Sequence, residues 1–256
     1  MNCPNCGREL PEEQQIYGLT YRPPCPCQEE ARKIIRQEEI LRGQCQLEEA
    51  YMRLSGVSER YRGADLNSIQ PQDGQEEAIE ACWDLVGKLR GNTGVMLVGG
   101  VGSGKTMIAS GTVIRLLKNQ ARRAGDDFKR NFAWGGNVLD HLLHPSALMV
   151  STVELFSQLK ACFDGRGSAD AVLHKYKAVP LLVLDDLGAE SSKDWGMGQI
   201  FEIIDRRYNE CLPTLITTNL LPKEIGNRMG ERTADRLREM CRVVNITTAS
   251  QRKTAE

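Results

Sequence analysis

Short apolar runs alternate with segments of helical periodicity along the last two thirds of the chain. Five such runs predict buried strands, namely GVMLVG (94–99), ALMVS (147–151), LLVLDD (181–186), TLITTN (214–219) and CRVVNI (241–246). Apolar residues at helical spacing predict helices between them, at 105–118, 152–163, 198–212 and 231–240. Buried strands that alternate with helices form a parallel sheet covered on both faces, so the pattern predicts an α/β fold.

The first third of the chain follows a different pattern. Residues 28–54 place Ile, Leu and Tyr near helical spacing among Glu, Arg and Gln, and residues 75–90 predict a further helix. The polar segment 55–74 contains Gly and Pro, as linkers do. We therefore expect three parts: a small module at 1–27, a helical linker or docking segment at 28–57, and an α/β domain at 58–256.

One segment breaks the alternation. Residues 119–145 lie between a predicted helix and a predicted strand, where a few residues would suffice, so we expect an insertion there. Its basic and aromatic residues would suit single-stranded DNA, and would equally suit a surface loop that packs on the domain. These residues are Arg122, Arg123, Phe128, Lys129, Arg130, Phe132 and Trp134. We interpret His141 and His144 as structural, because no further metal ligand is near them.

Composition limits the class of protein. The 256 residues are 41% hydrophobic and 26% charged, which is typical of a globular protein. The net charge of -1 argues against a uniformly basic nucleic-acid binder but allows a local basic patch. We see neither a secretory signal nor an apolar run of about 20 residues, and so expect a cytoplasmic protein. In that compartment the nine cysteines are expected to be thiols or metal ligands.

The segment GGVGSGKT follows the first predicted strand of the α/β domain and begins a helix, which is the context of a phosphate-binding loop. Glycines let backbone N–H groups turn inward, and the helix dipole favours an anion. Lys105 would contact the β- and γ-phosphates, and Thr106 would bind Mg²⁺. A glycine-rich helix cap is the alternative. The predicted loop comprises Gly99, Gly100, Val101, Gly102, Ser103, Gly104, Lys105 and Thr106.

Two adjacent carboxylates end the strand LLVL, a costly arrangement unless a positive group lies near them. A Mg²⁺ on Thr106 needs a carboxylate from a neighbouring strand, and Asp185 is the candidate ligand. Asp186 is then the candidate to orient or deprotonate an attacking water. The alternative for Asp186 is a cap of the turn in DDLG.

Four cysteines lie in two close pairs near the N-terminus, Cys3 with Cys6 and Cys25 with Cys27. Four thiolates in two pairs predict a tetrahedral Zn²⁺ site, although the C-x-C spacing is less usual than C-x-x-C. So short a segment cannot fold by burial of a core alone, and a metal would supply the stability. A set of disordered thiols is the alternative.

The order of these motifs over residues 58–252 resembles the bacterial replicative helicase loaders of the DnaC/DnaI type and the related IstB transposition ATPases, which are AAA+ proteins. The likeness includes ERYRGADLNS, the phosphate loop, VLDDLGAE, IIDRRYNECLPTLITTNL, GERTADRLREMC and a closing SQR. It implies an AAA+ P-loop fold in which a zinc module and helix precede the parallel sheet. A full helical lid is not expected, because few residues follow CRVVNI.

The resemblance also assigns residues. It implies that Asn219 is a polar sensor of the γ-phosphate or the water, on the strand between those of the phosphate loop and Asp185. Arg236 corresponds to an arginine finger that reaches the ATP of a neighbouring subunit, with Arg232 and Arg207 as weaker candidates. From the residues alone, the charges of ERTADRLRE could equally form ion pairs along a solvated helix.

The implied function is that of an ATPase which loads a replicative helicase onto single-stranded DNA. ATP, Mg²⁺ and Zn²⁺ would be its cofactors, and its slow, partner-stimulated turnover would be linked to self-association through the ATP site. The zinc module resembles one that DnaI-like loaders use to engage the helicase. The alternatives are an IstB-like transposition helper and a zinc-dependent adaptor that binds ATP with little hydrolysis.

Overall fold

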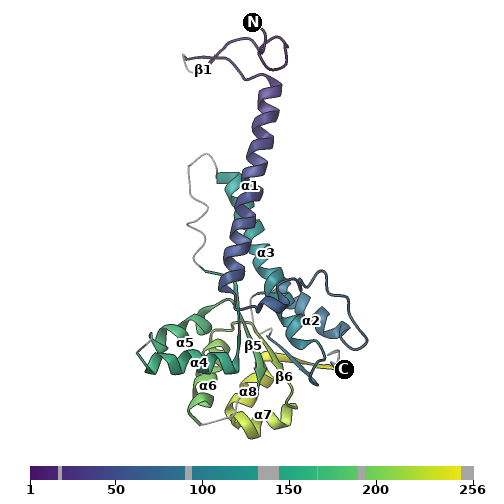
Figure 1. The fold of residues 1–256 in the computed structure, drawn as a ribbon, viewed down its shortest axis with the longest axis vertical. Helices are drawn as coiled ribbons and strands as arrows, with labels where there is room; N and C mark the ends of the chain where they lie inside the picture. Colours follow the sequence, from purple (N-terminus) through teal and green to yellow (C-terminus); the bar gives the residue numbers. More distant parts are fainter. Residues whose placement is uncertain (17–18, 90–93, 132–143, 166, 190–193, 249–256) are drawn as a thin grey trace.

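A long helix projects from a compact α/β body and carries a small N-terminal module at its far end (Figure 1). The computed structural model describes residues 1–16, 19–89, 94–131, 144–165, 167–189 and 194–248. The N-terminal module contains a two-stranded antiparallel sheet, β1 (Gln14–Ile16) and β2 (Leu19–Tyr21). The projecting helix is α1 (Pro26–Leu54).

The body is built on a five-stranded parallel sheet, as the alternating pattern predicts. Its order is β4-β5-β6-β3-β7, and every neighbouring pair is parallel. The strands are β3 (Gly94–Gly99), β4 (Ala147–Ser151), β5 (Leu181–Leu187), β6 (Thr214–Thr218) and β7 (Cys241–Ile246). Because β6 lies between β3 and β5, the loops that follow these three strands meet at one edge of the sheet.

Alternate side chains of each strand enter two separate cores. On β3, Val95 and Leu97 pack with α1, α2 (Glu76–Gly87) and α3 (Lys105–Asn131). Met96 and Val98 point to the other face, which five helices cover. These are α4 (Thr152–Phe163), α5 (Ala169–Ala178), α6 (Asp194–Asn209), α7 (Pro222–Met229) and α8 (Glu231–Met240). Both faces are therefore buried, and the strands show apolar runs rather than alternation.

The sequence pattern missed the two short helices α5 and α7, and it placed the end of α3 too early. Helix α3 continues through residue 131 instead of ending at 118, so residues 119–131 of the expected insertion are helical. The reason is contact with α1, since Ala121 is buried and a Cβ on Gly125 would lie 2.2 Å from Gln44 Nε2. Residues 132–143, with Phe132, Trp134 and His141, lie outside the described part of the chain.

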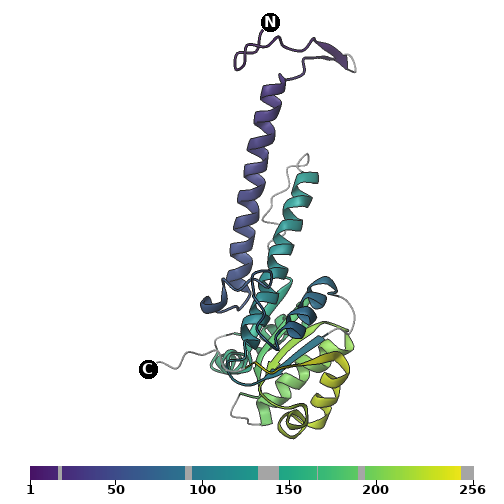
Figure 2. The same cartoon turned by 90° about the vertical axis from the view of Figure 1, so that its right-hand side faces the viewer.

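The C-terminal half of α1 belongs to the core of the body. Leu47 and Tyr51 are buried beside α3, and the two helices run side by side in both views (Figures 1 and 2). The chain after α1 is tied to the edge strand β4, because Met149 N donates to Ser55 O at 2.7 Å. A short 3₁₀ turn (Glu59–Tyr61) follows. No helix in the described ranges is both long and apolar enough to cross a bilayer.

Candidate nucleotide and metal sites

The loop between β3 and α3 has the backbone of an anion-binding nest. Gly102 and Gly104 have φ values of 82° and 92°, in the left-handed region that glycine adopts without strain. A Cβ on Gly104 would also lie only 2.5 Å from Gln75 Nε2. The Ser103 hydroxyl is buried in this loop and has no hydrogen-bond partner among the described residues. The loop therefore offers polar groups to an anion at the N-terminus of α3.

Lys105 lies at the centre of the site. Its side chain is almost fully buried, and Nζ donates to the carbonyl oxygens of Gly99 and Gly100 at 2.9 and 2.8 Å. The same Nζ donates to Asn219 Oδ1 at 2.8 Å. The structure thus brings Lys105 and Asn219 together, at the edge where β3 and β6 both end.

Asp185 faces Thr106, the residue after this lysine. Thr106 Oγ1 donates to Asp185 Oδ1 at 3.1 Å, and Thr217 Oγ1 on β6 donates to the same oxygen at 2.6 Å. Burial raises the pKa of the Asp185 carboxyl, as does the neighbouring Asp186, while the two threonine hydroxyls and Lys105 oppose the rise. A buried carboxylate beside a hydroxyl is a set of hard oxygen donors, which suits Mg²⁺.

Asp186 has a different environment from the aspartate before it. Its φ of 53° is left-handed, and the register of β5 against β6 shifts between Leu184 and Leu187. Its backbone N–H donates to Thr217 Oγ1 at 2.9 Å, and its carbonyl accepts from Thr152 Oγ1 at 3.0 Å. The backbone at Asp186 therefore departs from the regular strand, while its charge still acts on Asp185 and raises the pKa of that carboxyl.

Gln75 also supports the phosphate loop, and the sequence analysis did not find it. Its side chain is fully buried, Nε2 donates to Ser103 O at 2.8 Å, and Oε1 accepts from Gln72 N at 3.1 Å. The bond to Ser103 ties the segment before α2 to the loop after β3, and the bond from Gln72 holds the side chain in place. A glutamine in a polar linker carries no pattern that would have revealed this contact.

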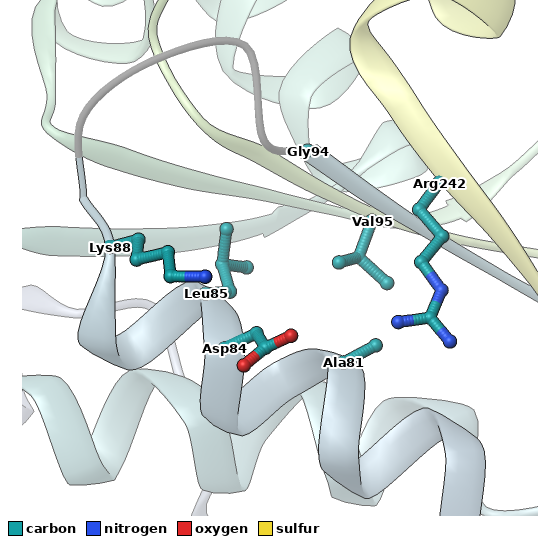
Figure 3. A pocket seen from close by; sticks show the side chains of 7 residues that line it. All are labelled: Ala81, Asp84, Leu85, Lys88, Gly94, Val95 and Arg242. Carbon is teal, nitrogen blue, oxygen red and sulfur yellow. The ribbon is translucent and has the colours of Figure 1, made fainter.

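Cavities lie at both ends of β3 among the described residues. One of about 630 Å³ is lined by Gln72, Asp73, Gly74, Thr247 and Thr248, which continue from Gln75 and from β7 on the phosphate-loop side. Another of about 240 Å³ lies between α2 and the opposite end of the sheet, where β3 begins at Gly94 (Figure 3). The first of these cavities lies next to Gln75, whose side chain bonds to Ser103 of the phosphate loop.

Arg236 lies on α8, away from the phosphate loop. Its Nε donates to Asp205 Oδ1 on α6 at 2.7 Å, and its guanidinium carbon is 4.3 Å from the ring centroid of Tyr208. Arg232 is exposed on the same helix. The roles implied for these two arginines remain predictions.

Arg207 does not form a subunit contact, and that prediction is wrong. The side chain is fully buried, and burial lowers the pKa of its guanidinium to about 9. It donates to the Thr214 hydroxyl and to five backbone carbonyls, those of Tyr176, Lys177, Val179, Pro180 and Pro213. It joins the end of α5 to the start of β6, so a neighbouring molecule cannot reach it.

The four N-terminal cysteines gather at one point. Their Sγ atoms all lie within 4.8 Å of one another, and Cys3–Cys27, Cys6–Cys25 and Cys25–Cys27 are each 3.5 Å apart. Tetrahedral Zn²⁺ with bonds of about 2.3 Å needs sulfurs roughly 3.8 Å apart, so the cluster fits the ion. Backbone N–H groups of Asn5 and Cys6 lower the pKa of the Cys3 thiol to about 6, whereas bonds to the Cys6 and Cys25 thiols raise the pKa of Cys27 to about 12.

Comparisons with known proteins agree with this architecture. The family described as IstB-like ATP binding protein matches residues 145–256. The chain is 26% identical over 189 residues to a protein named replicative helicase loader DnaC from Buchnera aphidicola, covering 72% of this chain and 67% of the relative. The crystal structure of the DnaC helicase loader is similar with a TM-score of 0.58 and 26% identity, covering 74% of this chain and all of that one. The crystal structure of DnaI is similar with a TM-score of 0.57 and 25% identity, covering 79% of this chain and 99% of that one.

Proposed function

We propose that this chain is a helicase-loading AAA+ ATPase of the DnaC/DnaI type, which delivers a replicative helicase to single-stranded DNA. The observation that carries the proposal is the meeting of Lys105, Thr106, Asp185 and Asn219 at one edge of the sheet. Those four side chains come from three neighbouring strand ends, where parallel sheets bind their ligands.

ATP would bind with its phosphates in the nest of the loop. Lys105 Nζ would exchange its bonds to the Gly99 and Gly100 carbonyls for β- and γ-phosphate oxygens, and Thr106 and Asp185 would hold Mg²⁺. The cation would supply charge neutralisation at the phosphates. The cavity lined by Gly74 and Thr247 lies next to Gln75 and would offer backbone and hydroxyl groups to the purine.

Hydrolysis would use the two aspartates in different roles. The Asp185 carboxylate accepts hydrogen bonds from Thr106 Oγ1 on α3, whereas among the described residues no side chain hydrogen-bonds to the Asp186 carboxylate. Asp186 would orient the attacking water, and Asn219 would sense the γ-phosphate through the atoms it already shares with Lys105. Arg236 would complete the site of an adjacent copy.

The N-terminal parts would engage the helicase. Cys3, Cys6, Cys25 and Cys27 would hold Zn²⁺ and fix the fold of residues 1–27. Helix α1 presents Ile34, Ile35 and Leu41 at 54%, 55% and 50% exposure between the zinc module and the body. Apolar side chains exposed together on one projecting element suit a protein partner. Residues 28–57 would therefore dock the helicase, and residues 58–256 would form the ATPase domain.

The test is a loading assay with the cognate replicative helicase, circular single-stranded DNA and ATP. We expect the helicase to be retained on the circle only when this chain is present, and phosphate release to rise with DNA or helicase. A Lys105→Ala chain serves as the control and should load nothing. Stimulation only by a transposase would instead support the transposition helper, and binding of ATP without turnover would support the adaptor.

A further inference from the structure

Helix α6 holds the guanidinium of Arg236 in a defined position. Nε donates to Asp205 Oδ1 at 2.7 Å, and the ring of Tyr208 lies under the guanidinium at 4.3 Å. The ring is itself fixed, because Tyr208 Oη donates to Glu239 Oε2 at 2.6 Å. Asp205 is fixed too, since its Oδ2 accepts from Asn209 Nδ2 at 3.1 Å.

The geometry of the ion pair between Arg236 and Asp205 determines which edge of the guanidinium can bind another group. The carboxylate engages Nε, so the edge of the guanidinium that carries the two Nη groups is not used by Asp205. That edge is the planar fork that binds a phosphate through two parallel hydrogen bonds. About a third of each side chain, 33% for Arg236 and 31% for Asp205, is exposed. A second molecule can therefore approach this pair.

The position of α8 argues against contact between Arg236 and a nucleotide bound by the same chain. Helix α8 packs with α6 on one face of the sheet, whereas α3, which begins at the phosphate loop, packs on the other. The last residue of α8 directly precedes β7, whose first residue is paired with Gly94 at the start of β3. The phosphate loop follows the opposite end of β3. A phosphate that meets Arg236 must belong to another copy.

We propose that Asp205 and Tyr208 are positioning residues that present the Nη fork of Arg236 to the ATP phosphates of an adjacent copy of this chain. The inference rests on the proposed function, because it needs Arg236 to act across a subunit boundary. A long arginine loses rotamer freedom when it binds, and a residue that is already oriented loses less. The opposite possibility is that Asp205 withholds Arg236 from the neighbour's phosphate.

The test uses mixtures in which each chain supplies one half of the shared site. The reference mixture combines Arg236→Ala, which keeps the phosphate loop, with Lys105→Ala, which keeps the finger. In mixture one, Asp205→Asn is added to the Lys105→Ala chain. In mixture two, it is added to the Arg236→Ala chain. Phosphate release from ATP is measured with single-stranded DNA and helicase present, and thermal unfolding checks that every chain is folded.

We expect mixture one to lose turnover by on the order of tenfold to a hundredfold, because a misplaced catalytic group costs about that much. Mixture two should match the reference, since its altered chain has no finger to position. Equal loss in both mixtures would overturn the inference in favour of a structural role for Asp205. A gain in mixture one would show that Asp205 withholds Arg236. A reference mixture without turnover would refute the trans role of Arg236, and the inference with it.

Tyr208 provides a second pair of variants on the Lys105→Ala chain. Tyr208→Phe keeps the ring under the guanidinium and loses the bond to Glu239, whereas Tyr208→Leu removes the ring. We expect Phe to retain more turnover than Leu in the mixture with Arg236→Ala. Equal turnover of the Leu variant and the unaltered chain would overturn the part assigned to Tyr208.

Discussion

Lys105 Nζ lies 2.8 Å from Asn219 Oδ1, although the two residues are 114 positions apart. They meet because β6, which Asn219 follows, is the neighbour of β3 in the sheet. The ammonium group of Lys105, proposed to hold the phosphates, therefore already contacts Asn219, the side chain proposed to sense them. Loss or arrival of a γ-phosphate would change the partners of Lys105 and so reach β6 directly.

Replacing Lys105 with alanine should weaken ATP binding by about 30-fold or more, because a charge-assisted hydrogen bond contributes about 2–3 kcal/mol. Titration with a fluorescent ATP analogue measures the affinity. Lys118→Ala on the same helix is the matched control, since Lys118 pairs with Asp65 and not with the loop. Equal affinity of the Lys105 variant and the wild type would contradict the phosphate-loop assignment.

Asp185→Asn and Asp186→Asn should have different effects. Asp185 touches Thr106 and Thr217, so its substitution should weaken the binding of ATP with Mg²⁺. Asp186→Asn should leave binding intact and lower the rate of phosphate release by about 10²-fold or more, the usual contribution of a general base. Binding and single-turnover hydrolysis are measured separately. The same loss of binding in both variants would mean that the pair holds the metal jointly.

Gln75→Ala should lower ATP affinity even though the residue lies 28 positions before Ser103 in the sequence. The change leaves the buried carbonyl of Ser103 without its donor, at a cost of about 1–3 kcal/mol. Gln70→Ala is the control, because that side chain is exposed and does not line the cavity proposed for the purine. Isothermal titration with ATP and Mg²⁺ measures both. An unchanged affinity would show that the loop keeps its shape without Gln75.

Metal analysis should find about one Zn²⁺ per chain, by the rule of four thiolates to one ion. Cys6→Ser should lose the ion and the folded N-terminal module, while Cys45→Ser should keep both because Cys45 is exposed on α1. The number of reactive thiols that appear when a chelator removes the ion gives a second measurement. A folded N-terminal module that contains no metal would refute the zinc assignment.

Arg207→Met should destabilise the protein by about 3–5 kcal/mol, the usual cost of breaking a buried charged network. The change removes the Arg207 donor from five carbonyls, and three of these hydrogen bonds are buried. Arg206→Met is the matched neighbour, and its exposed ion pair with Glu210 should be worth less than about 1 kcal/mol. Urea unfolding measures both. A loss of self-association in Arg207→Met without loss of stability would restore its predicted role as a subunit contact.

The sequence by itself determined the features that depend on neighbours along the chain. The strands at 94–99, 147–151 and 241–246 and the helix at 231–240 have the predicted bounds, because buried strands and helices leave an apolar pattern of their own period. The phosphate loop could be recognised from the sequence because its glycines and lysine lie within one short segment. The four N-terminal cysteines could also be recognised as candidate metal ligands, because each pair is closely spaced in the sequence.

Only the tertiary structure decided the features that depend on contacts between distant segments. Helix α3 extends to residue 131 because α1 covers it, and Gln75 reaches the loop because α2 packs beside β3. Arg207 and Arg236 look alike in sequence, yet one lies under α5 and β6 while the other lies at a partly exposed surface. Burial and hydrogen-bond partners separate such residues, and both are set by the packing of the sheet with its helices.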